Sequence, residues 1–362
     1  MSTIELKQVT KHFGSFTAVR DVDLSVTAGE VVCLLGPSGC GKTTTLRIIA
    51  GLERPSGGDV VIAGRRMNEL RPEQRDIAMV FQFYALYPAL TVAQNIGMPL
   101  HHEKLTQSDA ESRIRKVADI LHLTAVLDRF PGQISEGEKQ RVAVARAVIR
   151  DPNCFLFDEP LSRLDVELRQ SMRGQIKTVL AGLSKATVIV THDQLEALTM
   201  ADRIAIMRDG AIEQIASPHD VFAKPDNVFV ASFIGTPQMN LMEAEFEGME
   251  GTKGAFRVEG RRVRLDVDPA LGRMRKSTVT LGIRPRAFLP QAAVSADTLT
   301  ATTELIEPMG AETLVHARTP AGGDIRVVVP REVKMTIGEP LFLKTDARQT
   351  HVFDSSGQAV RS

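Results

Sequence analysis

The chain has 362 residues, a length that suggests roughly two to three domains and enough material for a large core. Its 44 Lys and Arg residues balance 44 Asp and Glu residues, and this neutral net charge argues against a dedicated nucleic-acid-binding protein. Hydrophobic residues make up 43% and charged residues 24%, which excludes an intrinsically disordered chain.

Three scattered cysteines, Cys33, Cys40 and Cys154, form no CxxC pair and no disulfide framework, which favours a reducing compartment. The N-terminal segment is charged and lacks the apolar core of a signal peptide. The most apolar stretch, residues 77–100, is interrupted by polar residues and prolines, so we expect no segment that spans a bilayer.

The first half of the chain alternates strand-like and helix-like segments. The alternating apolar residues of 22–26 predict a half-exposed strand, whereas the continuous apolar run 31–35 predicts a strand buried on both faces. Further strands are predicted at 60–62, 77–81, 155–157 and 187–190, with helices after residue 42, at 106–121 and at 135–150. Strands separated by helices are typical of a parallel α/β sheet.

The pattern changes after residue 217. Short helices are predicted at 218–223 and 227–234, and Gly235-Thr236-Pro237 is the predicted boundary between domains. From residue 241 onward, short β-rich runs separated by turns predict a small all-β domain of barrel or sandwich type. These runs are 255–258, 263–267, 278–283, 314–317, 325–329 and 341–344.

The strongest motif fits G-x-x-x-x-G-K-[ST] and stands between a buried strand and a helix. Its glycines let backbone N–H groups wrap a phosphate, and the helix N-terminus adds partial positive charge. Lys42 is expected to reach the β- and γ-phosphates, and the Thr43 hydroxyl to hold Mg²⁺. The predicted nucleotide-binding loop comprises Gly36, Pro37, Ser38, Gly39, Cys40, Gly41, Lys42, Thr43 and the following Thr44.

Two later strands end in polar residues that suit phosphate chemistry. The run Cys154–Phe157 is followed by Asp158 and Glu159, and the strand 187–190 is followed by Thr191 and His192. Beside a phosphate loop, Asp158 is the expected Mg²⁺-side carboxylate and Glu159 the base that polarises the attacking water. The alternative is that both strands simply finish in polar turns and that the histidine is structural.

The order of these motifs resembles the ATP-binding subunits of ABC transporters over essentially the whole chain. The similar segments are GPSGCGKT, Gln82 after a strand, ISEGEKQR, FLFDEP, SRLD and THD. The resemblance is closest to the carbohydrate importers of the maltose and glycerol-phosphate type, whose C-terminal motif looks like Leu281-Gly-Ile-Arg-Pro285. It implies a P-loop α/β ATPase domain over residues 1–235 and a small all-β, OB-like regulatory domain over 236–362. Within the first domain it implies a RecA-like core, a β subdomain and a helical subdomain at about 88–155.

The resemblance also implies roles for single residues. Phe13 resembles the aromatic that stacks on adenine, and a core phenylalanine is the alternative. Gln82 resembles the residue that links nucleotide state to the membrane subunits through Mg²⁺ and water, and His192 one that contacts the γ-phosphate. Ser162 and Asp165 resemble the loop that faces the second subunit of the dimer, although their polarity alone suits a solvated helix start.

The segment that resembles the family signature departs from Leu-Ser-Gly-Gly-Gln. It contains Ser135, Glu136, Gly137 and Glu138, which by the resemblance contact ATP held by the opposite subunit. Ser135 and Glu138 have the S-x-x-E spacing of a capping box, so Glu138 is expected to replace the usual Gln without cost. Glu136 adds a carboxylate that is expected to lower ATP affinity or turnover.

The expected function is therefore that of an ATP-hydrolysing, Mg²⁺-dependent subunit of a sugar importer. The resemblance implies that the chain forms a homodimer and that this homodimer binds two integral membrane permease subunits. It also implies a separate solute-binding protein and a peripheral position at the cytoplasmic face of the inner membrane. No nucleic acid is expected as a partner. The alternatives are an importer ATPase for another solute such as a polyamine, a non-transport ABC ATPase, a different P-loop kinase or GTPase, and a mainly regulatory module.

Overall fold

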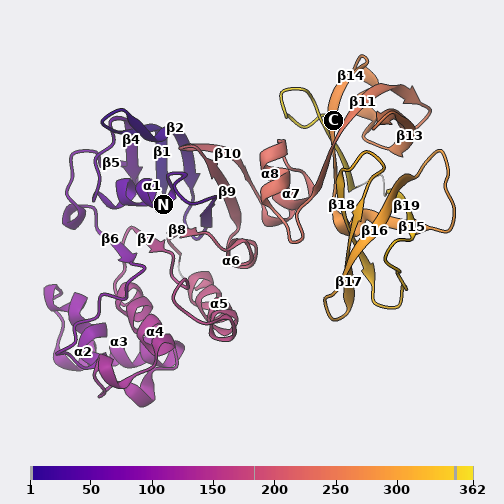
Figure 1. Cartoon of the computed structure of the whole chain (residues 1–362). Helices are drawn as coiled ribbons and strands as arrows, with labels where there is room; N and C mark the ends of the chain where they lie inside the picture. Colours follow the sequence, from indigo (N-terminus) through magenta and orange to yellow (C-terminus); the bar gives the residue numbers. More distant parts are fainter. Residues whose placement is uncertain (1–2, 183, 346–348, 362) are drawn as a thin grey trace. The chain divides into compact units, whose positions relative to one another are not determined.

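The computed structural model describes residues 3–182, 184–345 and 349–361. The chain divides into two compact units, residues 1–218 and 219–362. Figure 1 shows helices and two sheets in the first unit and mainly β structure in the second. Among the described residues no helix is long and apolar enough to cross a membrane.

The centre of the first unit is a mostly parallel six-stranded sheet in the order β10-β9-β3-β8-β7-β6. Its strands are β3 (Val31–Leu35), β6 (Ile77–Val80), β7 (Cys154–Asp158), β8 (Ala186–Thr191), β9 (Arg203–Arg208) and β10 (Ala211–Ala216). Only β10 runs antiparallel to its neighbour in this sheet. Every residue of β3 is buried, which confirms the strand predicted from the continuous apolar run.

A second, antiparallel sheet in the order β2-β1-β4-β5 belongs to the same unit. It contains β1 (Ile4–Phe13), β2 (Phe16–Val26), β4 (Gly57–Ile62) and β5 (Arg65–Arg66). The strand predicted at 60–62 therefore pairs with β1 and not within the parallel sheet, because local periodicity carries no information on the partner of a strand. The alternation predicted at 22–26 is confirmed, since Val22, Leu24 and Val26 are buried between exposed residues.

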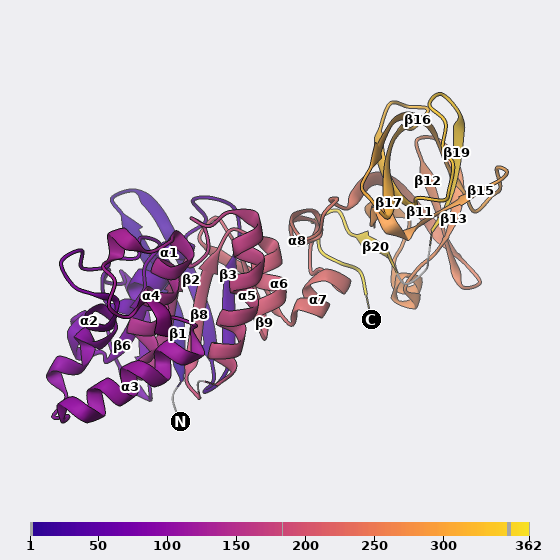
Figure 2. The same ribbon diagram turned by 90° about the horizontal axis from the view of Figure 1, so that it is seen from below.

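Helices cover the parallel sheet. The helices of the chain segment that connects β6 to β7 form a separate layer. They are α1 (Lys42–Ala50), α2 (Val92–Gly97), α3 (Gln107–Ile120), α4 (Glu136–Val148), α5 (Val166–Ala181) and α6 (Gln194–Met200). In Figure 2, α1 and α6 lie against the strands that they contact, while α2, α3 and α4 contact one another beside β6. The predicted helices at 106–121 and 135–150 are thus α3 and α4. Short 3-10 turns span Pro72–Gln74, Met98–His102, Thr124–Val126 and Pro131–Gln133.

The second unit begins with α7 (Pro218–Ala223) and α8 (Val228–Phe233) and continues as two packed antiparallel sheets. One sheet has the order β13-β12-β11-β14-β20 and the other β15-β19-β16-β17-β18. The strands are β11 (Asn240–Glu250), β12 (Lys253–Val258), β13 (Arg261–Asp266), β14 (Ser277–Ile283), β15 (Phe288–Gln291), β16 (Leu299–Pro308), β17 (Glu312–Arg318), β18 (Asp324–Pro330), β19 (Pro340–Thr345) and β20 (Thr350–Phe353). Short 3-10 turns span Pro269–Arg273 and Pro285–Ala287. Apolar side chains from both sheets form one core, as expected for an all-β domain.

The division between the units falls before the predicted Gly235-Thr236-Pro237 boundary. Helices α7 and α8 belong to the C-terminal unit because the buried Arg284 donates to the carbonyl oxygens of Ile234 at 2.7 Å and Phe222 at 2.5 Å. The end of the chain adds to this packing, since Asn227 forms a β-bridge with Gln358. A boundary drawn at the Gly-Pro turn would separate both segments from Arg284, and α8 from the strands β11 and β14 that it contacts.

Candidate active site

The phosphate loop joins β3 to α1, and two of its glycines have no space for a side chain. A Cβ at Gly36 would lie 2.3 Å from the carbonyl oxygen of Met207, and a Cβ at Gly41 would lie 2.4 Å from that of Ala18. Gly41 also has a left-handed φ of 102° at the N-cap of α1. These contacts explain why the loop requires glycine at both positions.

Lys42 lies over the loop with its side chain almost fully buried. Its Nζ donates to the carbonyl oxygens of Gly36 at 2.8 Å and Pro37 at 2.9 Å. Cys40 Sγ lies 3.7 Å from the same ammonium group. The positive charge is therefore held at the centre of the loop, where an anionic phosphate chain would bind.

The hydroxyl of Thr43 and the carboxylate of Asp158 meet at the end of β7. Thr43 Oγ1 donates to Asp158 Oδ1 at 3.5 Å. Burial raises the pKa of Asp158, and the neighbouring Glu159 adds to this, while Arg47 and the bond from Thr43 act in the opposite direction. A hydroxyl and a carboxylate beside a phosphate loop form the oxygen donor set that Mg²⁺ prefers.

Three loops at the carboxyl ends of adjacent strands converge on Glu159. Gln82 Nε2 donates to Glu159 Oε2 at 3.0 Å, and His192 Nδ1 lies 3.2 Å from Glu159 Oε1. Ser162 Oγ donates to the carbonyl oxygen of Glu159 at 3.0 Å. Because β6, β7 and β8 are neighbours in the parallel sheet, the residues that follow them meet at one edge.

Glu159 itself has an unusual backbone. Its φ is 47°, in the left-handed region, and its N–H donates to the carbonyl oxygen of Val190 on β8 at 2.9 Å. A left-handed conformation costs a residue with a side chain about 1 kcal/mol. The turn that carries this strain aims the carboxylate between Gln82 and His192.

Phe13 and Asp165 lie outside this group. Phe13 is at the end of β1 in the antiparallel sheet, with 46% of its surface exposed and Lys11 Nζ 4.7 Å from its ring centroid. Asp165 accepts from the backbone N–H of Leu168 at 2.9 Å and is the N-cap of α5. The alternative interpretation of Asp165 as a helix-start residue thus has a direct structural basis.

The signature-like segment starts α4 with the predicted capping box. Ser135 Oγ accepts from the N–H of Glu138 at 3.3 Å, and Glu138 Oε2 accepts from the N–H of Ser135 at 2.7 Å. Both the backbone and the hydroxyl of Ser135 lower the pKa of Glu138. A Cβ at Gly137 would lie 2.7 Å from Leu168 Cδ2, so this glycine allows close packing against α5.

Glu136, the unexpected acid, has a partner one turn along the helix. Lys139 Nζ lies 2.6 Å from Glu136 Oε1, and this bond lowers the pKa of the carboxyl. Arg163, from the loop after β7, also lowers it through its charge. The negative charge that the sequence places at the start of α4 is therefore partly compensated.

The sequence motifs assign no role to the ion pairs that hold the segment of His192 in place. Asp193 caps α6 and lies 3.4 Å from Arg169 Nη1 and 3.2 Å from Arg173 Nη2, both on α5. The buried Glu196 accepts from Thr191 Oγ1 at 2.6 Å. The position of Asp193 next to His192 is the only signal for this group in the sequence, because its arginine partners are 24 and 20 residues earlier, on the other side of β8.

A phosphate loop after a buried parallel strand, with paired acids at the end of a neighbouring strand, defines the class of P-loop nucleotide hydrolases. Comparison with known proteins defines the family. A model of the ABC transporter family matches residues 19–162, and a model of the TOBE domain matches residues 281–353.

Relatives match over the full length. The lactose transport ATP-binding protein LacK of Rhizobium radiobacter is 42% identical over 100% of both chains. The trehalose/maltose import ATP-binding protein MalK of Thermococcus litoralis is 43% identical over 99% of this chain and 100% of its own. A solved dimeric ATP-binding cassette in a post-hydrolysis state with ADP and Pi is 32% identical and covers 59% of this chain and 98% of its own, with a TM-score of 0.53.

The chain belongs to the ATP-binding subunits of ABC transporters, and within them it is an importer ATPase with a P-loop domain followed by a C-terminal TOBE domain.

Proposed function

We propose that this ATPase drives the uptake of a sugar or a sugar-like solute through partner membrane subunits. Its full-length relatives are named for the transport of lactose, of trehalose and maltose, and of sn-glycerol-3-phosphate. A further relative at 41% identity is a sulfoquinovosyl glycerol transport protein. These solutes share a polyhydroxylated carbon skeleton, which is the class we assign to the imported substrate.

Glu159 is the proposed general base. The observation that supports this role is the convergence of Gln82 and His192 on its carboxylate, at 3.0 and 3.2 Å. In this arrangement Glu159 accepts a proton from the attacking water, Gln82 positions that water, and His192 contacts the γ-phosphate. Gln82 lies in the chain between the edge strand β6 and the helices α2 to α4. A movement of Gln82 would therefore be transmitted to these helices.

Thr43, Asp158 and Gln82 are the proposed protein side of a Mg²⁺ site. The hydroxyl and carboxylate already lie 3.5 Å apart at the mouth of the loop, and the donors are all oxygen. When bound with ATP, Mg²⁺ neutralises charge on the β- and γ-phosphates. Lys42 and the loop from Gly36 to Thr44 hold the phosphates from the other side.

A homodimer completes the proposed nucleotide site. Ser135, Glu136, Gly137 and Glu138 at the start of α4 would contact ATP bound to the opposite subunit, and Ser162 and Asp165 would face the dimer partner. Phe13 is the proposed adenine-stacking residue, and its exposed ring supports that role. The dimeric state of the similar cassette structures supports the same assembly.

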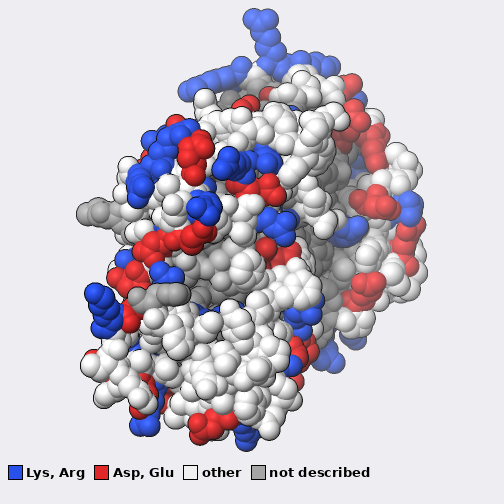
Figure 3. All heavy atoms as spheres, turned by 90° about the vertical axis from the view of Figure 1, so that its left-hand side faces the viewer, with Lys and Arg blue, Asp and Glu red and all other residues white. Residues whose placement is uncertain are grey.

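Two integral membrane permeases and a separate solute-binding protein are the proposed partners, with the ATPase peripheral at the cytoplasmic face of the membrane. Figure 3 shows one face of the first unit, where basic and acidic residues are interspersed. In the lower part of that view, at the height of α2 to α4 in Figure 1, uncharged residues predominate. The segment that leads into α2 and the turn after it expose Phe81, Phe83, Tyr87 and Met98, and exposed apolar residues of this kind suit contact with membrane subunits.

The decisive experiment is reconstitution of the ATPase with its candidate permeases in proteoliposomes. ATPase activity is measured with binding proteins loaded with sugars, a sugar phosphate or a polyamine. We expect stimulation by a sugar-type solute and none by the polyamine, and the complex carrying Glu159→Gln serves as the inactive control. Stimulation by the polyamine alone would reassign the substrate, and activity that no permease alters would favour a non-transport ATPase.

A further inference from the structure

The C-terminal unit contains a pocket that no step of ATP hydrolysis uses. It has a volume of about 240 Å³ and is lined by residues of both sheets: the turn between β12 and β13, the start of β16, and the loop before β18. A water molecule occupies about 30 Å³ of liquid, and protein cores contain few voids larger than one water. The pocket therefore has room for several waters or for one small organic molecule.

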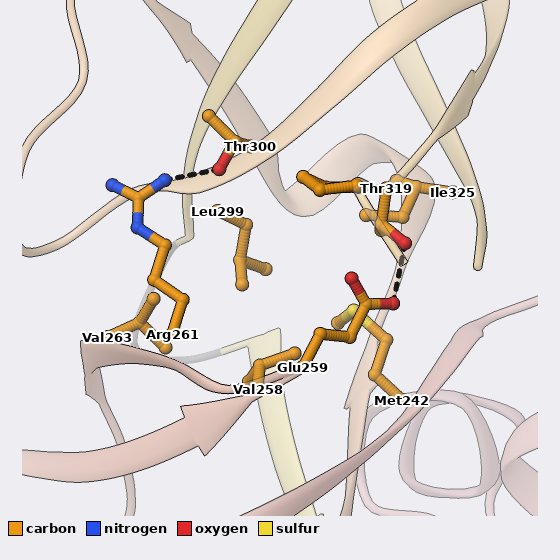
Figure 4. A pocket seen from close by; sticks show the side chains of 10 residues that line it. Met242, Val258, Glu259, Arg261, Val263, Leu299, Thr300, Thr319 and Ile325 are labelled. Atoms are coloured by element: carbon orange, nitrogen blue, oxygen red, sulfur yellow. Dashed lines mark hydrogen bonds between the residues drawn. The ribbon is translucent and has the colours of Figure 1, made fainter. Parts of the chain in front are cut away.

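Two polar groups of opposite charge stand at different sides of this pocket (Figure 4). Glu259 Oε1 accepts from the hydroxyl of Thr319 at 2.5 Å, and its Oε2 accepts from the N–H of Ala321 at 3.3 Å. Arg261 donates to the hydroxyl of Thr300 and, at 3.2 Å, to the carbonyl oxygen of Ser295. Each charge is thus already stabilised by protein groups.

Hydrogen-bonding capacity remains on both sides. A guanidinium carries five N–H donors, of which the two bonds above use two, and an ionised carboxylate accepts about four bonds. The aliphatic side chains of Val258 and Leu299 lie between the polar ends, and Val263 lines the pocket beside Arg261. No aromatic ring is among the residues that line the pocket in the described part of the chain.

We propose that this pocket binds a small, uncharged, polyhydroxylated ligand, a monosaccharide or short polyol. A hydroxyl group both donates and accepts, so one ligand can donate to Glu259 and accept from Arg261 while its C–H surface lies on the aliphatic side chains. A volume of about 240 Å³ lies below the roughly 300–1,000 Å³ of sites for drug-sized ligands, which favours a small ligand.

An ionic ligand fits the pocket less well. A phosphate would be attracted by Arg261 and repelled by Glu259. An ammonium group would be attracted by Glu259 and repelled by Arg261. A zwitterionic amino acid would lose the hydration of two charges to reach groups that protein partners already satisfy. The neutral hydroxylated ligand exchanges only hydrogen bonds with water.

This ligand class lies within the broader class of sugar-like solutes that we propose is imported. The inference therefore rests on the proposed function for its physiological meaning, as solute sensing by the TOBE-containing unit, but on the pocket for its chemistry. Glu259, Arg261 and the residues between them belong to the unit that lacks the phosphate loop, so binding is expected without nucleotide.

Calorimetric titration of the full-length protein, without nucleotide, tests the site. Glucose, galactose and glycerol are the probes, and leucine and inorganic phosphate are the ionic comparisons. We expect saturable binding of at least one neutral probe and a tenfold or greater loss of affinity in Arg261→Met. The matched control is Arg257→Met on the same hairpin, whose guanidinium pairs with Glu247 outside the pocket and whose loss should leave affinity unchanged.

Glu259→Gln provides a second variant of nearly the same size, in case Arg261→Met lowers the thermal unfolding midpoint, and it should also weaken binding. The inference is overturned if no neutral probe binds saturably, if leucine or phosphate binds in preference, or if both pocket variants bind like the wild type. Transport assays test the proposed function separately. Sugar transport by a protein that binds no neutral probe would refute only the pocket proposal, and polyamine transport would refute only the proposed substrate class.

Discussion

At the residue scale, Gln82 and His192 contact the Glu159 carboxylate, and the phosphate loop does not, so we predict that its proposed role in water activation is separable from nucleotide binding. We predict that Glu159→Gln keeps ATP affinity and lowers turnover by about 10²–10⁴-fold, the usual contribution of a general base. ATP-dependent dimers should accumulate because the bound nucleotide is no longer consumed. Steady-state ATPase assays and light scattering measure the two effects.

Glu167→Gln, at an exposed position in the first turn of α5, is the matched control and should retain wild-type turnover. A Glu159→Gln enzyme that hydrolyses ATP at a near wild-type rate would show that the base is another residue.

The ion pair between Glu136 and Lys139 predicts a coupled effect on ATP binding across the dimer. Lys139→Met should lower the apparent ATP affinity about two- to fivefold, the range expected from an exposed ion pair, because Glu136 would then repel the γ-phosphate. Glu136→Gly should restore affinity in the Lys139→Met background and have a smaller effect alone. ATP titrations of all four proteins give the coupling energy.

Glu138→Gln is the control for this cycle, since glutamine can complete the same capping box with Ser135 and should be nearly neutral. Additive effects of the two substitutions, with no rescue, would show that Glu136 does not face the nucleotide.

At the scale of elements, β20 carries a partly buried histidine that makes the C-terminal unit sensitive to acid. Burial lowers the pKa of His351 to about 4 from its ordinary 6.5, and the charges of Arg284 and Arg361 add to the shift. Between these two values the unfolded chain binds a proton that the folded chain does not. Folding stability should therefore fall as the pH drops from about 6.5 to 4, by at most about 3 kcal/mol.

Denaturant unfolding at pH 7.5 and pH 5 measures this dependence, and His351→Gln should reduce it. The control is His219→Gln, because the His219 side chain is 84% exposed and its environment changes little on folding. An equal pH dependence in wild type and His351→Gln would assign the acid sensitivity to other groups.

At the scale of the whole molecule, the chemistry and the TOBE domain occupy different compact units. The phosphate loop, both acids and His192 all lie before residue 218, so a chain truncated after Pro218 should bind ATP with wild-type affinity. Truncation after Gly235 should leave α7 and α8 without their core and expose Val221, Val230 and Ile234, which are fully buried in the intact chain. That longer fragment should aggregate more readily.

Nucleotide binding and sedimentation of the two fragments test this difference, with the full-length chain as reference. A shorter fragment that is folded but does not bind nucleotide would show that the site depends on the C-terminal unit.

Several features of this protein follow from contiguous residues alone. The phosphate loop, the buried strand before it and the capping box of Ser135 and Glu138 depend on backbone conformation and short-range periodicity, which neighbouring residues specify. The all-β character of the C-terminal unit also follows from the short runs and turns, although these runs predict no strand at β11, β15, β16 or β20.

Only the tertiary structure decided which of these features meet. The sheet order placed Gln82 and His192 against Glu159, and it paired the strand at 57–62 with β1 in a separate sheet. Packing against the buried Arg284, which is distant in sequence, assigned residues 219–235 to the C-terminal unit. The packing of the two β sheets left a pocket between Glu259 and Arg261. Strand partners and side-chain contacts depend on residues distant in sequence, whereas local patterns report only which face of an element is apolar.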